Sequence, residues 1–107
     1  MTKQIVPRYK LMLFYDLPAA DPEKYYNFVM TELVPSVQSM GLYMFRVYHT
    51  LWGNDCPLRQ AEFVAEDLAT IQAALDSERW KELEVKLAEH TTNYRRKIVK
   101  FRPGFQF

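Results

Sequence analysis

The chain has 107 residues, which is enough for one domain and too few for two. Hydrophobic residues make up 49% and aromatic residues 15%, and these fractions exclude an intrinsically disordered chain. The net charge is +1, with 14 basic and 13 acidic residues, so the sequence gives no electrostatic sign of binding to nucleic acid or to an anionic membrane.

Cys56 is the only cysteine, and a single thiol cannot form a disulfide within the chain. We therefore expect a reducing compartment, with the cytoplasm as the default. No run of about 18 apolar residues is present to span a membrane, and residues 1–7 lack the apolar stretch of a signal peptide. His49 and His90 lack the spacing of zinc ligands, so we expect neither a metal nor a cofactor.

The first strand and the first helix are marked clearly. Residues 9–16 (YKLMLFYD) are apolar at both alternating positions, which predicts a strand covered on both faces. A helix start follows at Asp21-Pro22-Glu23, with Asp21 as the N-cap. Apolar residues then recur at steps of three and four, the pattern of an amphipathic helix. Pro35 should kink or divide this helix, and Gly41 should end it.

A hairpin is predicted next. Residues 42–52 (LYMFRVYHTLW) are rich in aromatic and β-branched residues, which favours a strand. Residues 58–66 alternate largely between apolar and polar positions, and residues 53–57 form the turn between the two strands. Arg46 and Glu62 are expected to pair across this hairpin.

A second helix should run from Asp67 to about His90, with a break at residues 76–78 where Ser77 caps the second piece. Residues 95–101 (RRKIVKF) form the last predicted strand, and Pro103-Gly104 should end it. We interpret the local basic cluster as the solvated tips of a strand edge, formed by Arg95, Arg96, Lys97, Lys100 and Arg102.

The element order β-α-β-β-α-β predicts an α+β, ferredoxin-like fold, with two helices on one face of a four-stranded antiparallel sheet. Residues 1–107 form one predicted domain, with a core over about residues 9–102. The first two strands are apolar at both alternating positions, so the other sheet face should also be covered. A second copy of the same sheet is the expected cover, giving a homodimer through the sheet faces, and a monomer with an apolar face is the alternative.

The element order, Val34-Pro35 followed by Gly41-Leu42, and residues 66–72 (EDLATIQ) leading to 76–80 (DSERW) resemble the dimeric α/β-barrel superfamily over residues 9–102. Within it, the chain is similar to the stress-responsive barrel, EthD-like and NIPSNAP-like proteins. The resemblance implies a barrel formed across a dimer and room for a small-molecule pocket between sheet and helices. The superfamily includes enzymes of several kinds and proteins with no assigned activity, so the fold does not define a function.

The acid–base residues of the best-aligned enzyme of this superfamily are absent. The plant polyketide cyclase of this superfamily uses two histidines and a tyrosine, and the aligned positions here hold Arg59, Trp80 and Ala74. Leu33 stands where EthD-like proteins often carry a histidine. The residue types of the haem-degrading branch occur without its motif, at Asn27, Trp80 and His90.

By the cyclase alignment, one side of the first strand faces the helices, at Tyr9, Leu11, Leu13 and Tyr15. Ala61 and Ala65 on the third strand should leave space beneath the helices. The candidate ligand-binding residues are Tyr9, Tyr15, Phe28, Arg59, Phe63 and Trp80. The alternative is that these residues fill the core. His49 is the candidate general base, because the unperturbed pKa of histidine lies near neutrality.

Three functions remain open. The leading hypothesis is a homodimeric barrel protein that binds an apolar or aromatic small molecule between sheet and helices. The second is a cofactor-independent monooxygenase, isomerase or cyclase acting on an aromatic or polyketide-like compound. The third is a structural or interaction module with a filled core. The sequence does not decide whether the protein is an enzyme.

Overall fold

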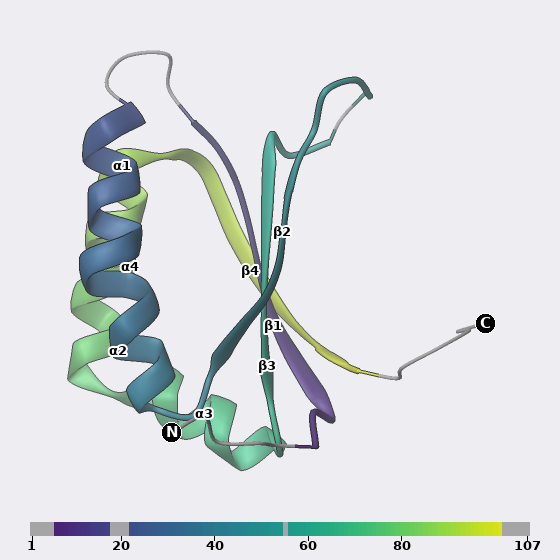
Figure 1. Ribbon diagram of the computed structural model, residues 1–107, viewed down its shortest axis with the longest axis vertical. Coiled ribbons are helices and arrows are strands. Elements are labelled where there is room, and N and C mark those ends of the chain that lie inside the picture. The colour runs from purple at the N-terminus through teal and green to yellow at the C-terminus, as the bar shows by residue number, and fades with distance from the viewer. Residues whose placement is uncertain (1–5, 18–21, 55, 102–107) are drawn as a thin grey trace.

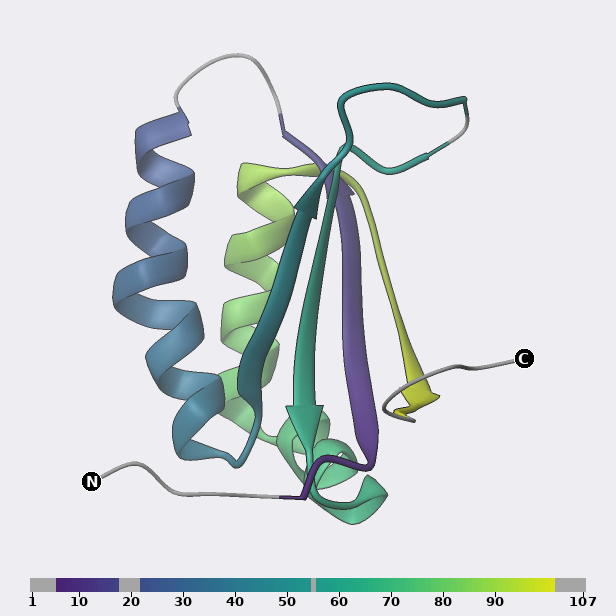
Figure 2. The ribbon, with the colours of Figure 1, turned by 45° about the vertical axis from the view of Figure 1, so that its right-hand side comes forward.

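The computed structural model describes residues 6–17, 22–54 and 56–101. Its sheet is antiparallel and has the strand order β2-β3-β1-β4. The strands are β1 (Tyr9–Asp16), β2 (Tyr43–His49), β3 (Arg59–Ala65) and β4 (Thr92–Lys100). The helices of the described residues cover one face of this sheet (Figures 1 and 2). The predicted α+β class and the ferredoxin-like β-α-β-β-α-β order are confirmed.

The first helical segment is continuous but changes its geometry just before Pro35. It consists of α1 (Pro22–Phe28), the π-helical turn η1 (Val29–Leu33) and α2 (Val34–Ser39). Proline has no N–H, and its ring collides with the carbonyl four residues earlier in a regular helix. The wider π turn relieves this collision, and the N–H of Val34 donates to the carbonyl of Val29. The interruption expected at Pro35 is therefore present as a π turn.

The second helical segment divides at Ser77, as predicted. α3 (Leu68–Asp76) begins after Asp67, whose carboxylate accepts a hydrogen bond of 2.7 Å from the N–H of Thr70. The hydroxyl of Ser77 accepts a hydrogen bond of 3.1 Å from the N–H of Trp80 and so caps α4 (Glu78–His90). These caps replace intrahelical partners that the first N–H groups of a helix lack.

Gly41 ends the first helical segment, as expected, and also allows a close contact between segments. Its φ is +90°, a conformation that residues with a Cβ rarely adopt. A Cβ at this position would lie only 2.8 Å from Cγ2 of Thr70 on α3. The absence of a side chain at Gly41 thus allows α2 and α3 to approach each other.

The predicted hairpin strands are longer than the observed ones. β2 ends at His49 rather than at Trp52, because the chain leaves the sheet after Thr50, whose N–H donates to the carbonyl of Leu58 at 2.7 Å. β3 is one residue shorter at each end than the predicted range of 58–66.

β4 begins at Thr92, three residues before the predicted start. Asn93 has a φ of +55°, and its side-chain amide donates to Oδ2 of Asp16 at 2.9 Å. This contact accompanies a register shift between the Phe14–Arg95 and Asp16–Thr92 pairs, where β4 has one residue more than β1. The predicted N-cap Asp21 and the predicted stop at Pro103-Gly104 lie outside the described residues.

The hydrophobic core lies between the sheet and the helices. Its members on β1 and β3 share the side that was expected to face the helices. Both the sheet and the helices contribute fully buried side chains. The largest of these are Trp80, Tyr15, Phe63, Leu11, Leu13, Leu33, Leu42, Ile71, Leu83 and Leu87. Burial of such side chains supplies most of the driving force for folding.

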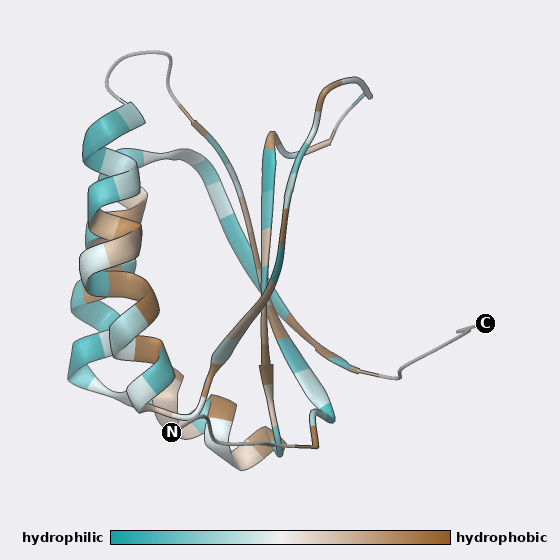
Figure 3. Cartoon of the chain, viewed as in Figure 1, coloured by the Kyte–Doolittle hydropathy of each residue, from teal (hydrophilic) through white to brown (hydrophobic). Residues whose placement is uncertain are grey.

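Hydrophobic and hydrophilic residues are interspersed along the strands (Figure 3). The sheet face opposite the helices is called the open face below. Its centre holds Glu62, which is almost fully buried. The carboxylate of Glu62 accepts hydrogen bonds from Lys10 at 3.0 Å, from Arg46 at 3.3 Å and from Gln60 at 2.8 Å. The expected Arg46–Glu62 pair is confirmed. By strand register, the open face is formed by Lys10, Met12, Phe14, Tyr43, Arg46, Tyr48, Gln60, Glu62, Val64, Arg95, Lys97 and Val99.

β2 is an edge strand and is exposed along most of its length. Large hydrophobic side chains are nevertheless concentrated on it and on the loop that follows, namely Met44, Phe45, Val47, Tyr48, Leu51 and Trp52. Such a patch is typical of a surface that another molecule covers. Within the described ranges, no helix is long and apolar enough to cross a membrane.

Candidate functional site

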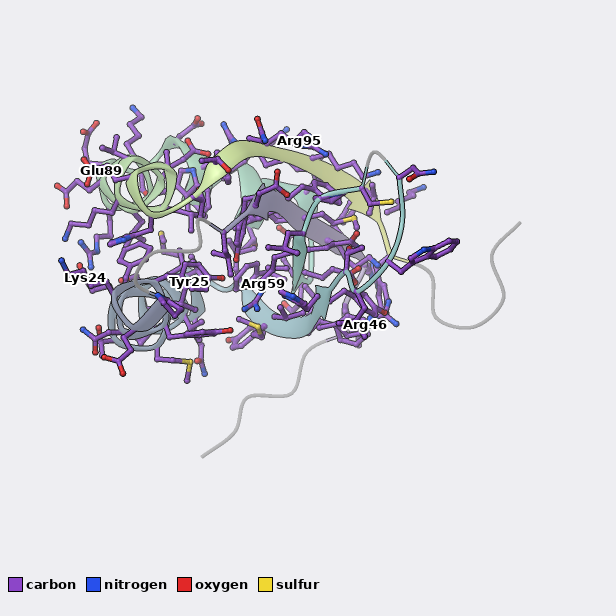
Figure 4. All side chains as sticks on the ribbon, turned by 90° about the horizontal axis from the view of Figure 1, so that it is seen from above. Lys24, Tyr25, Arg46, Arg59, Glu89 and Arg95 are labelled. Atoms are coloured by element: carbon purple, nitrogen blue, oxygen red, sulfur yellow. The ribbon has the colours of Figure 1, made fainter. Side chains whose placement is uncertain are left out.

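At the end of the sheet where β3 begins, side chains from α1 and from three strands form a polar cluster. Arg59 is the first residue of β3 and pairs in register with His49, the last residue of β2. β1 contributes Tyr15, and α1 contributes Tyr25 and Tyr26. Figure 4, which views the molecule from this end, shows Tyr25 and Arg59 on adjacent elements. These five residues are called the Arg59 cluster below.

The guanidinium group of Arg59 lies among aromatic side chains. Its Nη2 donates to the hydroxyl of Tyr26 at 3.0 Å and to Nδ1 of His49 at 3.1 Å. Its central carbon lies 5.7 Å from the ring centroid of Tyr25 and 5.3 Å from that of Tyr26, within the range of cation–π attraction. Because Nδ1 of His49 accepts a hydrogen bond from Arg59, the N–H of the neutral imidazole ring lies on Nε2.

The Nε–H of Arg59 is buried and has no hydrogen-bond partner among the residues that the structure describes. A buried donor without an acceptor costs about 1–3 kcal/mol, and such donors are rare in native proteins. An acceptor oxygen of a ligand would remove this cost, and a carboxylate would also neutralise the charge. The Arg59 cluster therefore presents a cationic donor group that the described residues do not saturate.

A buried pair of tyrosines lies beside this arginine. The hydroxyl groups of Tyr15 and Tyr25 are hydrogen-bonded to each other, and the two rings meet edge to face with centroids 5.8 Å apart. Burial raises the pKa of Tyr15, and the neighbouring Tyr25 raises it further. Burial also raises the pKa of Tyr25, although the Tyr15 hydroxyl and the charge of Arg59 oppose this effect. Both hydroxyls are therefore protonated near neutral pH and can donate hydrogen bonds.

Of the six predicted ligand-binding residues, the structure brings only Tyr15 and Arg59 into the Arg59 cluster. Tyr15 and Arg59 meet at the Arg59 cluster, with Tyr25 between them. Phe28, Phe63 and Trp80 belong to the hydrophobic core, and Tyr9 packs at its edge. Phe28 stacks at a tilt on the ring of His90, with centroids 5.5 Å apart.

The space expected beneath Ala61 and Ala65 is not open in the structure. Ala65 has no surface accessible to water, and the neighbouring core residues Leu11, Leu13 and Leu83 have none either. A cavity large enough for a ligand would leave accessible surface on the residues that line it. A ligand site among the core residues stays a prediction, whereas the Arg59 cluster lies at the margin of the core, where Tyr26 is exposed.

Tyr25 and Tyr26 were not predicted as site residues. The helical spacing marked Tyr25 as part of an apolar helix face, which does not distinguish a core tyrosine from one that contacts a charged group. The signal present in the sequence was the pair of adjacent tyrosines in α1, close in sequence to the end of β1. Only the packing of α1 on the sheet brings both residues to Arg59.

Cysteine and metal chemistry were also considered in the sequence. Cys56 is exposed, and its thiol donates to the carbonyl of Asn54 at 3.2 Å. Within residues 6–17, 22–54 and 56–101, no group of three or more His, Cys, Asp or Glu side chains is placed to hold a metal ion.

Comparison with known proteins gives similarity in structure only. No family model matches the sequence, and no curated protein sequence shows a significant match. Among solved structures, an EthD family protein from Bacillus halodurans is 15% identical with a TM-score of 0.66, and the match covers 89% of this chain and 99% of that protein. The chain has the fold of the EthD-like and NIPSNAP-like proteins. The predicted resemblance is thus confirmed at the level of fold.

Two further structures of the same fold are an enzyme and a protein of unknown function. A hydroxynitrile lyase from Passiflora edulis is 9% identical with a TM-score of 0.70, over 94% of this chain and 98% of the lyase. A dimeric protein of unknown function with a ferredoxin-like fold, from Bacteroides fragilis, is 11% identical with a TM-score of 0.55, over 92% of this chain and 100% of that protein. Because all these identities are so low, these matches establish the fold and leave the function open.

Proposed function

We propose that this chain forms one domain that acts as a homodimer and binds a small aromatic molecule carrying an acidic group at the Arg59 cluster. The observation that supports this proposal is the buried Nε–H of Arg59, which has no acceptor among residues 6–17, 22–54 and 56–101. The carboxylate of the ligand would accept from this N–H, and its aromatic part would contact the rings of Tyr25 and Tyr26. The single cysteine, Cys56, supports a reducing compartment such as the cytoplasm.

The homodimer is supported by the apolar surface that the isolated chain leaves uncovered. β2 exposes Phe45 and Tyr48, and the adjoining loop exposes Leu51 and Trp52. A second copy of the sheet would cover the open face, and a protein of the same fold from Bacteroides fragilis is described as dimeric. Sedimentation of the protein as a monomer at micromolar concentration would contradict this part of the proposal.

A cofactor-independent enzyme is the second candidate, and one observation favours it. The Tyr15 and Tyr25 hydroxyls remain protonated beside the cationic Arg59. Protonated hydroxyls and a guanidinium group are suited to stabilising negative charge on a substrate oxygen. His49 is poorly placed as a base through Nδ1, since this atom already accepts from Arg59.

The binding proposal is tested with benzoate as the probe and the uncharged benzamide as its control. Calorimetric titration should detect benzoate binding to the wild-type protein and weaker binding of benzamide. Arg59→Met should weaken benzoate binding by at least about tenfold, as expected for loss of a charged hydrogen bond. Arg79→Met serves as the matched control, because Arg79 lies on α4 with ion pairs to Glu32 and Glu82.

Equal benzoate binding by Arg59→Met and the wild-type protein would overturn the proposed site. Absence of benzoate binding to the wild-type protein would favour the third hypothesis, an interaction module with a filled core. Consumption of an aromatic ester or ketone by the wild-type protein, lost in Tyr25→Phe, would instead support the enzyme.

A further inference from the structure

The tip of the β2–β3 loop, formed by Leu51 and Trp52 and called the hairpin tip, is the most exposed apolar feature in the described part of the chain. Each of these two side chains is 93% exposed. A tryptophan that is covered by a partner buries roughly 150–250 Å², so leaving it in water forgoes a large stabilising contribution. Adjacent exposed hydrophobic residues of this size indicate a contact with another molecule.

The base of this loop is fixed, so the hairpin tip projects from a defined position. The N–H of Thr50 donates to the carbonyl of Leu58, and its hydroxyl donates to the carbonyl of Pro57, each at 2.7 Å. The N–H of Leu58 donates to Oδ1 of Asp16 at the end of β1, also at 2.7 Å. Figures 1 and 2 show the loop leaning away from the helices, toward the side of the open face.

The open face has a matching hollow at the same end of the sheet. The hollow has a volume of about 290 Å³ and is lined by Phe14, Pro57, Arg95, Arg96 and Lys97. The guanidinium carbon of Arg95 lies 5.9 Å, and Nζ of Lys97 lies 5.5 Å, from the ring centroid of Phe14. The hollow therefore has an aromatic floor beside two cations, which suits an indole ring through apolar contact and cation–π attraction.

We propose that each subunit of the homodimer inserts Trp52 into the hollow beside Phe14 of the partner subunit. This inference rests on the homodimer proposed above and names the residues that hold it together. A second copy is the occupant that fits, because the aromatic tip and the cationic hollow belong to one chain and lie on one side of its sheet. A two-fold axis makes such a self-complementary contact twice, so the loss of one side chain removes two contacts.

Sedimentation equilibrium of three proteins tests this contact. The wild-type protein should be dimeric at micromolar concentration. Trp52→Ala should raise the dimer dissociation constant by at least about tenfold, as for a central aromatic interface residue. Val85→Ala, which truncates another exposed apolar side chain on α4, should leave the constant unchanged. Circular dichroism should show both variants folded, since neither side chain is buried within its own chain.

The hollow is tested from the other side with Arg95→Ala combined with Lys97→Ala. This double variant should also weaken the dimer, and adding Trp52→Ala should weaken it no further, because all three changes remove the same contact. Additive effects of the two sets of changes would place Trp52 and the cations in separate contacts and would overturn the proposal.

Tryptophan fluorescence supplies a second readout, which reports the surroundings of the Trp52 side chain directly. The sequence has two tryptophans, and Trp80 is buried in the core of each subunit. The difference between the spectra of the wild-type protein and Trp52→Phe reports Trp52 alone. This signal should shift to longer wavelength on dilution from dimer to monomer, as the indole ring returns to water.

The possible failures are distinct. A monomeric wild-type protein would remove the homodimer and the hairpin-tip contact together. A dimeric wild-type protein whose dissociation constant and Trp52 emission do not respond to these changes would overturn the hairpin-tip contact alone. Binding of benzoate at Arg59 is measured independently of both outcomes.

Discussion

The hydroxyl group of Tyr15 on β1 is hydrogen-bonded to the hydroxyl group of Tyr25 on α1, and both side chains are almost fully buried. This contact is a polar link between sheet and helix, at the margin of the hydrophobic core and beside Arg59. Its two members depend on each other, because each hydroxyl would lose its buried partner if the other were removed.

Tyr15→Phe should therefore destabilise the fold by about 1–3 kcal/mol, the cost of leaving the Tyr25 hydroxyl without this partner. Tyr25→Phe should cost at least as much, since Tyr25 also contacts Arg59. The double variant should be more stable than the sum of the two single effects implies, because no unpaired hydroxyl remains. Urea denaturation followed by circular dichroism measures all three values, and strictly additive effects would contradict the coupling.

Glu62 is predicted to make the fold dependent on pH in the acidic range. Burial would raise the pKa of its carboxyl group, but hydrogen bonds from Lys10 and Gln60 outweigh burial and lower the pKa below the ordinary value of 4.5. The folded state therefore binds this proton less readily than the unfolded state. The contribution to stability is present above pH 4.5 and is lost as the pH falls through the lower folded-state value.

Glu62→Gln should destabilise the protein by about 2–3 kcal/mol at neutral pH, because Lys10 loses its counter-charge in a largely buried position. The variant should also lose the part of the acid dependence that Glu62 contributes. Glu82→Gln is the matched control, as Glu82 forms an exposed ion pair with Arg79 and should have little effect. Urea denaturation at a fixed protein concentration and at several pH values gives the comparison. Parallel pH profiles of Glu62→Gln and the wild-type protein would contradict the assignment.

The sequence predicted the element order because its local signals agree with one another. Gly41 and Ser77 act on the backbone next to them, so their effects are visible without tertiary structure. The start of β4 was missed because it depends on Asn93 bonding to Asp16, a contact between residues far apart in the chain. Local propensity cannot report such a contact.

The Arg59 cluster, too, depends on contacts between residues far apart in the chain, which the sequence could predict only in part. Arg59 and Tyr15 were predicted from strand alternation together with the resemblance to the polyketide cyclase, which implied the side of the strand that faces the helices but not the group that a side chain meets. Tyr25 and Tyr26 join them through helix packing. The unpaired Nε–H of Arg59 is a property of the packed molecule, so only the structure could show it.

Gly41 offers a test of how closely the two helical segments approach. Gly41→Ala should destabilise the protein by about 1–3 kcal/mol, because alanine is strained at a φ of +90° and its Cβ would meet Cγ2 of Thr70 at 2.8 Å. Thr70→Ser removes that methyl group and keeps the hydroxyl that contacts Asp67 at 2.7 Å. The combination Gly41→Ala with Thr70→Ser should therefore recover the steric part of the loss and leave the conformational part.

Urea denaturation of the two single variants and the double variant separates the two parts through their coupling free energy. A Gly41→Ala variant as stable as the wild-type protein would show that neither constraint operates. A double variant with no recovery would show that the strained backbone alone accounts for the loss.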